Sequence, residues 1–178
     1  MYNNHPKGLK TLFFTEMWER MSYYGMRGIL VLFMTASINN GGLDFSNTSA
    51  SAIYGIYAAA VYLMALPGGW LADNIFGQQK TILFGGIVIM FGHLSLAIPN
   101  MTFFYLGLIL VVMGTGLLKP NISAIVGGLY EKNPSMKESG FTIFYMSINI
   151  GSILGFFICG YLGENIGWHY GFGAAGIG

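Results

Sequence analysis

The amino-acid sequence predicts an all-α membrane protein, and two observations lead to that fold class. Its 178 residues are 54% hydrophobic and 16% aromatic but only 8% charged, whereas about 25% of the residues in soluble domains are charged. The apolar residues also gather into runs long enough for a helix to cross a bilayer, which takes about 20 residues. We therefore expect the lipid bilayer to be a partner and nucleic acid not to be one.

Five apolar runs are predicted to span the membrane, and a sixth helix is expected to begin near Tyr170. In chain order the spans cover residues 9–38, 50–72, 81–98, 102–130 and 139–162. Polar residues, glycine or proline break the helical pattern after each run: in order, NNGGLDFSNTS, DNIFGQQK, Pro99-Asn100, EKNPSMKES and GENIGWHYG. The 27 glycines suit closely packed membrane helices, because small residues let two backbones approach.

The predicted helices make one domain, residues 1–178. A chain that ended inside a sixth span would leave packing faces and backbone groups uncovered. We therefore expect these residues to be the N-terminal transmembrane bundle of a longer chain. The C-terminal bundle, which is absent from this sequence, would be its partner.

Lysines in the connecting segments predict the orientation. Lys7 and Lys10 precede the first span, and Lys80, Lys132 and Lys137 lie in the second and fourth connections. The first, third and fifth connections hold no lysine or arginine. Because cytoplasmic loops carry an excess of these residues, we expect a multi-pass protein of the bacterial inner (plasma) membrane with a cytoplasmic N-terminus.

One face of the first predicted span carries charge into the membrane. Offsets of 3, 4, 7 and 11 residues place the following side chains on that face: Glu16, Glu19, Arg20, Tyr23 and Arg27. An ionised side chain near the bilayer centre costs at least about 2.5 kcal/mol, so such residues normally face a partner or a wet cavity. This face is therefore predicted to line a functional site inside the bundle.

Lys119 is the matching charge on the fourth predicted span. At a rise of about 1.5 Å per residue, Glu16 to Arg20 lie about 9–15 Å beyond Lys10, and Lys119 lies about 16 Å before Tyr130. Because the two spans run in opposite directions, a carboxylate and the Lys119 ammonium are predicted to meet. A proton and an anionic solute would then compete for the same groups. The alternative is a static ion-pair network that only fixes helix packing.

Several stretches of the chain resemble the proton-dependent oligopeptide transporters. GLKTLFFTEMWERMSYYGMRGIL, residues 8–30, is similar to that family's first helix, while residues 114–130 and 141–155 resemble its fourth and fifth helix motifs. GGWLADNIFGQQK, residues 68–80, resembles the loop motif of the major facilitator superfamily. The resemblance covers nearly the whole chain. It implies a major facilitator type fold and symport of di- and tripeptides with protons by alternating access.

The resemblance also implies roles for charged residues. Glu16, Glu19 and Lys119 are expected to handle proton coupling, while Arg20, Lys119 and Arg27 are expected to attract the peptide carboxylate. An arginine suits a bidentate carboxylate, whereas the charge of a lysine responds to its surroundings. No cofactor is implied other than the proton as coupling ion. The single cysteine, Cys159, allows no multi-cysteine zinc site, and no metal is expected.

Uncharged residues complete the site that the resemblance implies. The expected substrate ligands are Tyr23, Tyr24, Tyr62 and Asn149, and the loop motif contributes Asp73, Gly77 and Lys80. For Asn149 a hydrogen bond between helices is the alternative. Packing between helices or a place at the membrane interface is expected instead for another set of tyrosines, namely Tyr54, Tyr57, Tyr105 and Tyr130.

Two further residues carry local expectations. His93, alone on an apolar predicted helix, is interpreted as a core residue with a satisfied hydrogen bond rather than as a proton relay. Pro120 directly follows Lys119 and is expected to kink the fourth span, because proline removes a backbone donor and clashes with the preceding turn.

Other function classes remain as alternatives or are excluded. A related carrier of nitrate or another small anion would also need a cavity of arginine and lysine. A non-transporting membrane scaffold would use the charges only to specify helix pairing. The sequence holds no G-x-S-x-G, H-E-x-x-H or phosphate-binding loop motif, so an enzyme is not expected.

Overall fold

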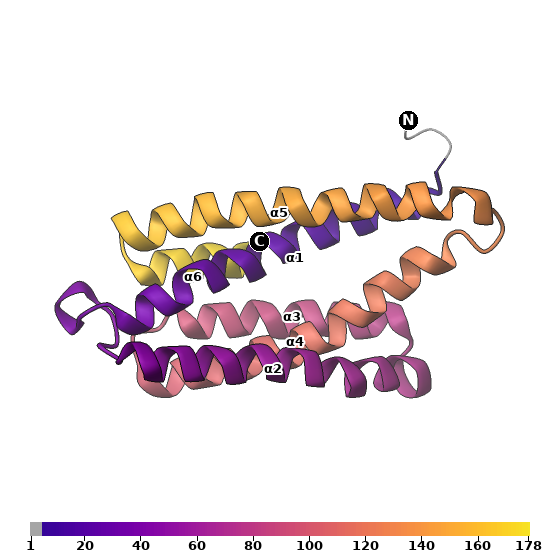
Figure 1. The fold of residues 1–178 in the computed structure, drawn as a ribbon. Coiled ribbons are helices and arrows are strands. Elements are labelled where there is room, and N and C mark those ends of the chain that lie inside the picture. The colour runs from indigo at the N-terminus through magenta and orange to yellow at the C-terminus, as the bar shows by residue number, and fades with distance from the viewer. Residues whose placement is uncertain (1–4) are drawn as a thin grey trace.

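The computed structural model describes residues 5–178, which form six α-helices joined by short connections (Figure 1). Their bounds are α1 Lys7–Thr35, α2 Asn47–Leu71, α3 Gln78–Leu96, α4 Met101–Gly128, α5 Lys137–Asn165 and α6 Trp168–Ile177. Each predicted span corresponds to one helix, and the ends differ by a few residues only. The prediction of an all-helical membrane fold is therefore confirmed.

Two of the differences lie around the connection between α1 and α2. The helix α1 ends at Thr35, before the predicted end, because the chain folds back in a turn in which Asp44 N–H donates to Ala36 O at 2.9 Å. Gly41 adopts a left-handed φ of 73° in that turn, a conformation that favours glycine. The helix α2 begins earlier than predicted because the Ser46 side chain accepts a hydrogen bond from Ser49 N–H at 3.1 Å and so caps it.

The helices form two groups, which Figure 1 shows as two layers. In one group, α1 packs along α5, and α6 contacts both. In the other group, α4 packs against α3 and also against α2. Figure 1 shows α4 running obliquely, so that its C-terminal end reaches the start of α5. Consequently α4, which carries Lys119, connects the layer of α2 and α3 with the layer that contains the charged helix α1.

Glycines allow the closest helix contacts. A Cβ atom at Gly151 or Gly155 of α5 would overlap the backbone of α1 at the carbonyls of Met17 and Met21. The backbones of α1 and α5 can therefore approach only because these positions lack side chains. This contact holds the turn of α1 from Met17 to Met21 firmly against α5, and Glu19 and Arg20 lie on that turn.

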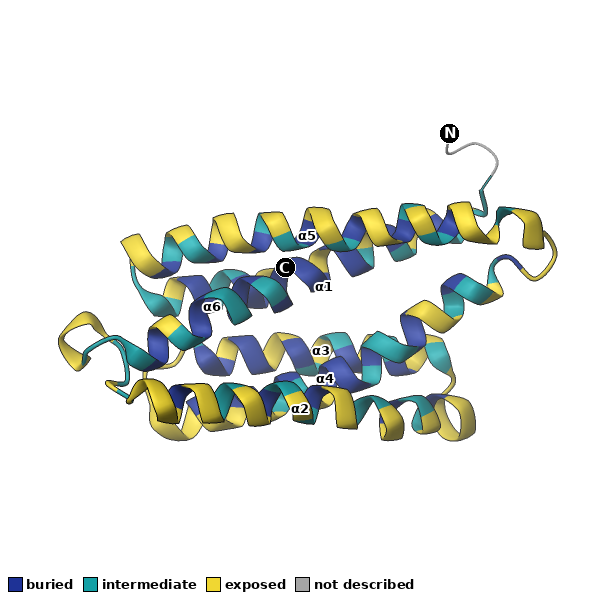
Figure 2. Cartoon of the chain, viewed as in Figure 1, coloured by how far each residue is buried: buried dark blue, intermediate teal, exposed yellow. Residues whose placement is uncertain are grey.

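Four described helices have the length and composition of membrane spans, namely α2 with the turn that follows it, α3, α4 and α5. The helix α1 is 29 residues long, about 43 Å at 1.5 Å per residue, which exceeds the hydrocarbon thickness of about 30 Å. Its apolar composition is interrupted by Glu16, Arg20 and Arg27. Figure 2 shows exposed residues along the outer faces of α2 and α5. Many of them are large apolar side chains, such as Leu66 and Phe157.

Candidate functional site

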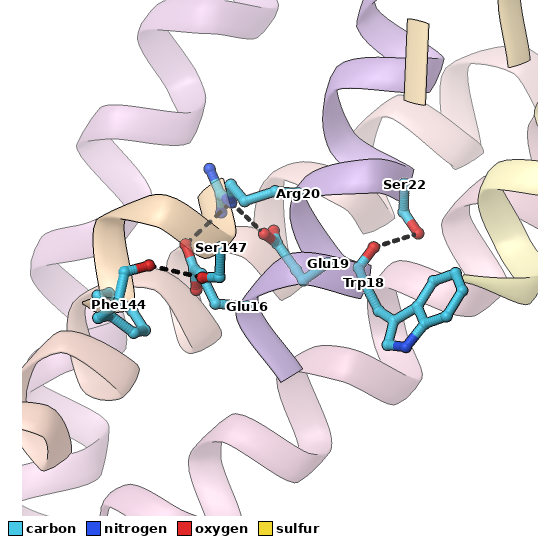
Figure 3. A network of polar contacts seen from close by, with 7 residues as sticks. All are labelled: Glu16, Trp18, Glu19, Arg20, Ser22, Phe144 and Ser147. Atoms are coloured by element: carbon cyan, nitrogen blue, oxygen red, sulfur yellow. Dashed lines mark hydrogen bonds and ion pairs between the residues drawn. The ribbon is translucent and has the colours of Figure 1, made fainter. Parts of the chain in front are cut away.

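A buried cluster of three charged side chains lies near the middle of α1 (Figure 3). Arg20 Nε lies 3.1 Å from Glu16 Oε1, one helical turn away, and Arg20 also forms an ion pair with Glu19. Only 3% of Glu16, 7% of Glu19 and 2% of Arg20 is exposed. When all three are ionised, two carboxylates and one guanidinium leave the cluster with one net negative charge.

The packing of α5 against α1 buries this cluster. Gly151 lies against the backbone and Cβ of α1 at Met17 and Arg20, which removes water from one side of the charged turn. Ser147 of α5 lies beside Glu16 in Figure 3, but its hydroxyl donates to Phe144 O at 2.6 Å. The carboxylate therefore gains no hydrogen bond from that hydroxyl.

Two carboxylate oxygens in the cluster have neither a hydrogen bond nor an ion-pair contact. Within residues 5–178, Glu16 Oε2 and Glu19 Oε1 are buried and accept no hydrogen bond. A buried charged group without full hydrogen bonding costs several kcal/mol in general, unless a partner or a proton neutralises it. The cluster can therefore lower its free energy by binding a proton.

Tyrosine rings lie against the guanidinium of Arg20. Its central carbon is 5.1 Å from the ring centre of Tyr23 and 6.0 Å from that of Tyr24. Tyr23 is buried and Tyr24 is half-buried, with its ring packed near Phe156 of α5. These contacts join two predicted substrate ligands to the ion cluster.

Arg27 lies two turns beyond Arg20 on α1 and contacts α2. Its Nε donates a hydrogen bond to the hydroxyl of Tyr54, and its guanidinium carbon lies 5.2 Å from the Tyr54 ring centre. Among residues 5–178, no carboxylate lies within ion-pair distance of Arg27. The sequence predicted for Tyr54 only helix packing or an interfacial place, so its bond to a site arginine is an unforeseen contact.

Lys119 lies against α2 rather than against a carboxylate. Its Nζ is 5.0 Å from the ring centre of Tyr62, which is 68% exposed. The ion pairs of the described chain both lie within α1, so the expected meeting of Lys119 with a carboxylate is not formed in this conformation. Arg20 takes both carboxylates instead, because its backbone position already places it within reach of each.

Asn149 is exposed on α5 and its Nδ2 donates to Tyr145 O of the preceding turn at 3.2 Å. In the part of the chain that the structure describes, it makes no hydrogen bond to another helix. Its amide oxygen is therefore accessible, and the alternative of a hydrogen bond between helices is not realised.

The loop motif lies at the far end of α2 and the start of α3. Asp73 belongs to the helical turn Ala72–Phe76, and Gly77 has a φ of 77°, which favours glycine. Asp73 and Lys80 are both exposed, and no ion pair joins them in the described residues. The motif thus forms the turn between α2 and α3.

His93 differs from its expectation. It is fully buried, yet neither ring nitrogen has a hydrogen-bond partner within residues 5–178, so the prediction of a satisfied hydrogen bond is wrong there. The imidazole borders a cavity of about 670 Å³ between α1, α3 and α6 that Glu19 and Ser22 also line.

Among the other tyrosines, Tyr57 is buried in the core, as packing between helices requires. Tyr130 is buried, and its hydroxyl is hydrogen-bonded to His5 Nδ1 at 2.8 Å.

Tyr54 was the residue that sequence reasoning missed. The available signal was its spacing of eight residues from Tyr62, close to two helical turns.

Comparisons with known proteins identify the family. The model of the POT family matches residues 79–178. The chain is 53% identical over 175 residues to the uncharacterized transporter YclF of Bacillus subtilis, covering 98% of this chain and 36% of that protein. It is 48% identical over 176 residues to a di-/tripeptide transporter of Lactococcus lactis, covering 97% of this chain and 35% of that protein.

A solved structure agrees with these sequence matches. The crystal structure of the peptide transporter POT in complex with sulfate matches with a TM-score of 0.95 and 48% identity, over 99% of this chain and 36% of that one. The chain thus spans about a third of the length of the proteins it matches, and these relatives are transporters, not enzymes. The matched segment and the agreement in fold together place this multi-pass membrane chain in the POT family.

Proposed function

We propose that residues 1–178 belong to a symporter that carries di- and tripeptides with protons into the cell. Two kinds of observation support the proposal. The chain belongs to the POT family, and a relative of 48% identity is named a di-/tripeptide transporter. The site also combines buried carboxylates with cations that face no carboxylate, which is what coupled binding of a proton and an anionic group requires.

The observation that carries the proposal is the unequal pairing of the charges. Arg20 is paired with Glu16 and Glu19, whereas Arg27 and Lys119 lie against tyrosines. With all five ionised, the set has one net positive charge, because three cations face two carboxylates. One peptide carboxylate would neutralise it.

Proton binding and peptide binding are then coupled. Protonation of Glu16 or Glu19 removes a negative charge and weakens the hold of that carboxylate on Arg20. The site becomes more positive and attracts an anionic group more strongly, so each ligand favours the other. A proton gradient can thereby drive peptide accumulation.

The uncharged ligands suit a substrate with a constant backbone and variable side chains. Asn149 offers an exposed amide, and Tyr23 and Tyr62 offer hydroxyl groups without fixed charge. The neighbouring surfaces of α2 and α5 are largely apolar. A few polar groups fix orientation in such sites, while apolar walls tolerate different side chains.

Alternating access requires a second bundle. We propose that residues 1–178 are the N-terminal half-site of a bacterial inner-membrane protein, with the N-terminus in the cytoplasm. Five lysines in the N-terminal and cytoplasmic connecting segments support that orientation. The C-terminal bundle would close the cavity, and rocking of the two bundles would expose the site to each side in turn.

The test is dipeptide uptake by the complete transporter in lipid vesicles, with and without an inward proton gradient. We expect accumulation only with the gradient. In Glu16→Gln the gradient should no longer drive accumulation, while exchange of labelled for unlabelled dipeptide continues. Uptake of nitrate that dipeptides do not inhibit would instead support the anion carrier, and gradient-driven uptake left intact by Glu16→Gln would support a purely structural role for the charges.

A further inference from the structure

The contact between Arg27 and Tyr54 is the one polar bond between α1 and α2 in the described residues that involves a charged side chain. The tyrosine is half-buried and packs against the main hydrophobic core, which also contains Tyr57 and Val61 of the same helix. Its ring position is therefore fixed by packing, whereas the arginine side chain is long and otherwise free to change rotamer.

The nitrogen of Arg27 that donates in this contact determines which of its other N–H groups can bind a second ligand. A guanidinium has five N–H donors in a rigid plane, one on Nε and two on each Nη. A carboxylate can bind it in two ways, across Nε and one Nη or across both Nη atoms. Because Tyr54 occupies Nε, only the edge formed by the two Nη atoms stays available.

The free edge remains accessible. Arg27 is half-buried, in contrast to Arg20, which is 2% exposed and engaged by two carboxylates. No carboxylate of residues 5–178 lies within ion-pair distance of Arg27. Its terminal nitrogens are therefore free to meet an anionic group from outside the described chain.

We infer that Tyr54 is a positioning residue, which holds Arg27 by Nε so that the two Nη atoms face the carboxylate of the peptide. The inference rests on the proposed function and adds a residue to it that acts only through Arg27. The hydroxyl oxygen of Tyr54 is the group that positions Arg27, because it accepts the hydrogen bond from Nε. The aromatic ring without the hydroxyl would keep its packing against the core.

The test measures dipeptide uptake kinetics of the complete transporter after Tyr54→Phe, which removes the hydroxyl and keeps the ring. We expect KM to rise about tenfold, which corresponds to about 1.4 kcal/mol of lost binding, while Vmax changes by less than about twofold. Inhibition by a dipeptide amide, which lacks the carboxylate, should stay unchanged. A general structural defect would instead lower Vmax and weaken both ligands.

A second variant separates positioning from packing. Arg27→Lys removes the planar group, so it should raise KM by itself, and adding Tyr54→Phe to it should raise KM no further. Tyr161→Phe is the matched control, because Tyr161 is exposed on α5 and its hydroxyl makes no hydrogen bond within the described residues. Thermal unfolding of each purified variant checks the fold. If Tyr54→Phe is less stable, the comparison of dipeptide with dipeptide amide on that same variant keeps the test decisive, because a loss of folded protein affects both ligands alike.

The outcomes distinguish the two claims. Normal dipeptide uptake with an unchanged KM in Tyr54→Phe overturns the role of Tyr54 and leaves the proposed function intact. If Tyr54→Phe raises KM equally in the unaltered transporter and in Arg27→Lys, the role of Tyr54 is also overturned. Failure of the unaltered transporter to bind or take up any dipeptide overturns the proposed function, and the role of Tyr54 with it.

Discussion

Two helix interfaces of this bundle use the same packing device but differ in charge. Between α1 and α5, Gly151 and Gly155 allow close backbone approach, and between α3 and α4, Gly85 and Gly114 do the same. Within the described residues, the buried side chains of α3 and α4 include no carboxylate, lysine or arginine, whereas α1 buries Glu16, Glu19 and Arg20.

The difference teaches that close helix packing needs no charge in this protein. A buried ion pair is weak evidence for stability, because desolvation opposes the attraction. The charges on α1 therefore add nothing that the α3 and α4 interface cannot achieve with glycine alone. Their presence points to function, and each of the following predictions can break or sharpen that contrast.

The largest effect is expected from Arg20→Met. Removing the guanidinium leaves Glu16 and Glu19 buried side by side without a cation, which should cost about 3–5 kcal/mol of unfolding free energy and abolish uptake. Denaturant or thermal unfolding of the complete transporter measures the stability.

The triple variant Glu16→Gln, Glu19→Gln and Arg20→Met sharpens this result. It carries no charge in the cluster, so stability should recover to near that of the unaltered protein while proton-driven uptake stays lost. If the triple variant is as unstable as Arg20→Met alone, the cluster stabilises the fold, and the contrast between the two interfaces breaks down.

Glycine substitutions rank next and should affect both interfaces alike. Gly155→Ala and Gly114→Ala each introduce a Cβ that overlaps the neighbouring helix backbone, so each should cost about 1–3 kcal/mol. Gly160→Ala, where a Cβ meets nothing within 4 Å, is the control and should be neutral. Unfolding temperatures of the three variants provide the measurement, and a neutral Gly155→Ala would contradict the described contact of α1 with α5.

A smaller effect is expected from Tyr62→Leu. The ring of Tyr62 faces the Lys119 ammonium at 5.0 Å, an attraction that contributes about 0.5–1 kcal/mol at an exposed site. The dipeptide KM should therefore rise about two- to fivefold. Tyr145→Leu, which alters an exposed α5 tyrosine, should leave KM unchanged. An equal response of the two variants would show that the contact with Lys119 contributes nothing specific.

The smallest effect is expected from Asp73→Asn in the loop motif. Asp73 is exposed and forms no ion pair in the described residues, so the unfolding free energy should change by less than about 0.5 kcal/mol. Gly77→Ala, at a φ of 77°, should cost about 1 kcal/mol or more, because a Cβ is disfavoured in that region. A larger loss for Asp73→Asn than for Gly77→Ala would reveal a charge contact that the described residues do not contain.

The sequence predicted most of the fold because each helix can be recognised from its own residues. Apolar runs and the breakers between them located α2 to α5, and the charge of α1 did not hide its helical periodicity. The residues at the ends were harder, since the Ser46 cap and the turn around Gly41 decide them through specific hydrogen bonds. The candidate site residues were predicted from the ordered motif of residues 16 to 27 and from Lys119.

The pairing within the site could not be predicted in the same way. Matching depth suggested that Lys119 meets a carboxylate, but depth leaves the rotation of each helix about its axis undetermined. The structure places Lys119 against Tyr62 and Arg27 against Tyr54, contacts that depend on how α2 packs beside α1 and α4. His93 shows the same limit, because the pattern of one helix does not tell whether a side chain of another helix reaches the ring.

By itself, the sequence determined which segments cross the membrane and which side chains bring charge into it, because both follow from local composition and helical periodicity. Only the tertiary structure decided which cation is paired and which stays available. That choice depends on distances of a few ångströms between helices, and these are set by where glycines let the backbones touch.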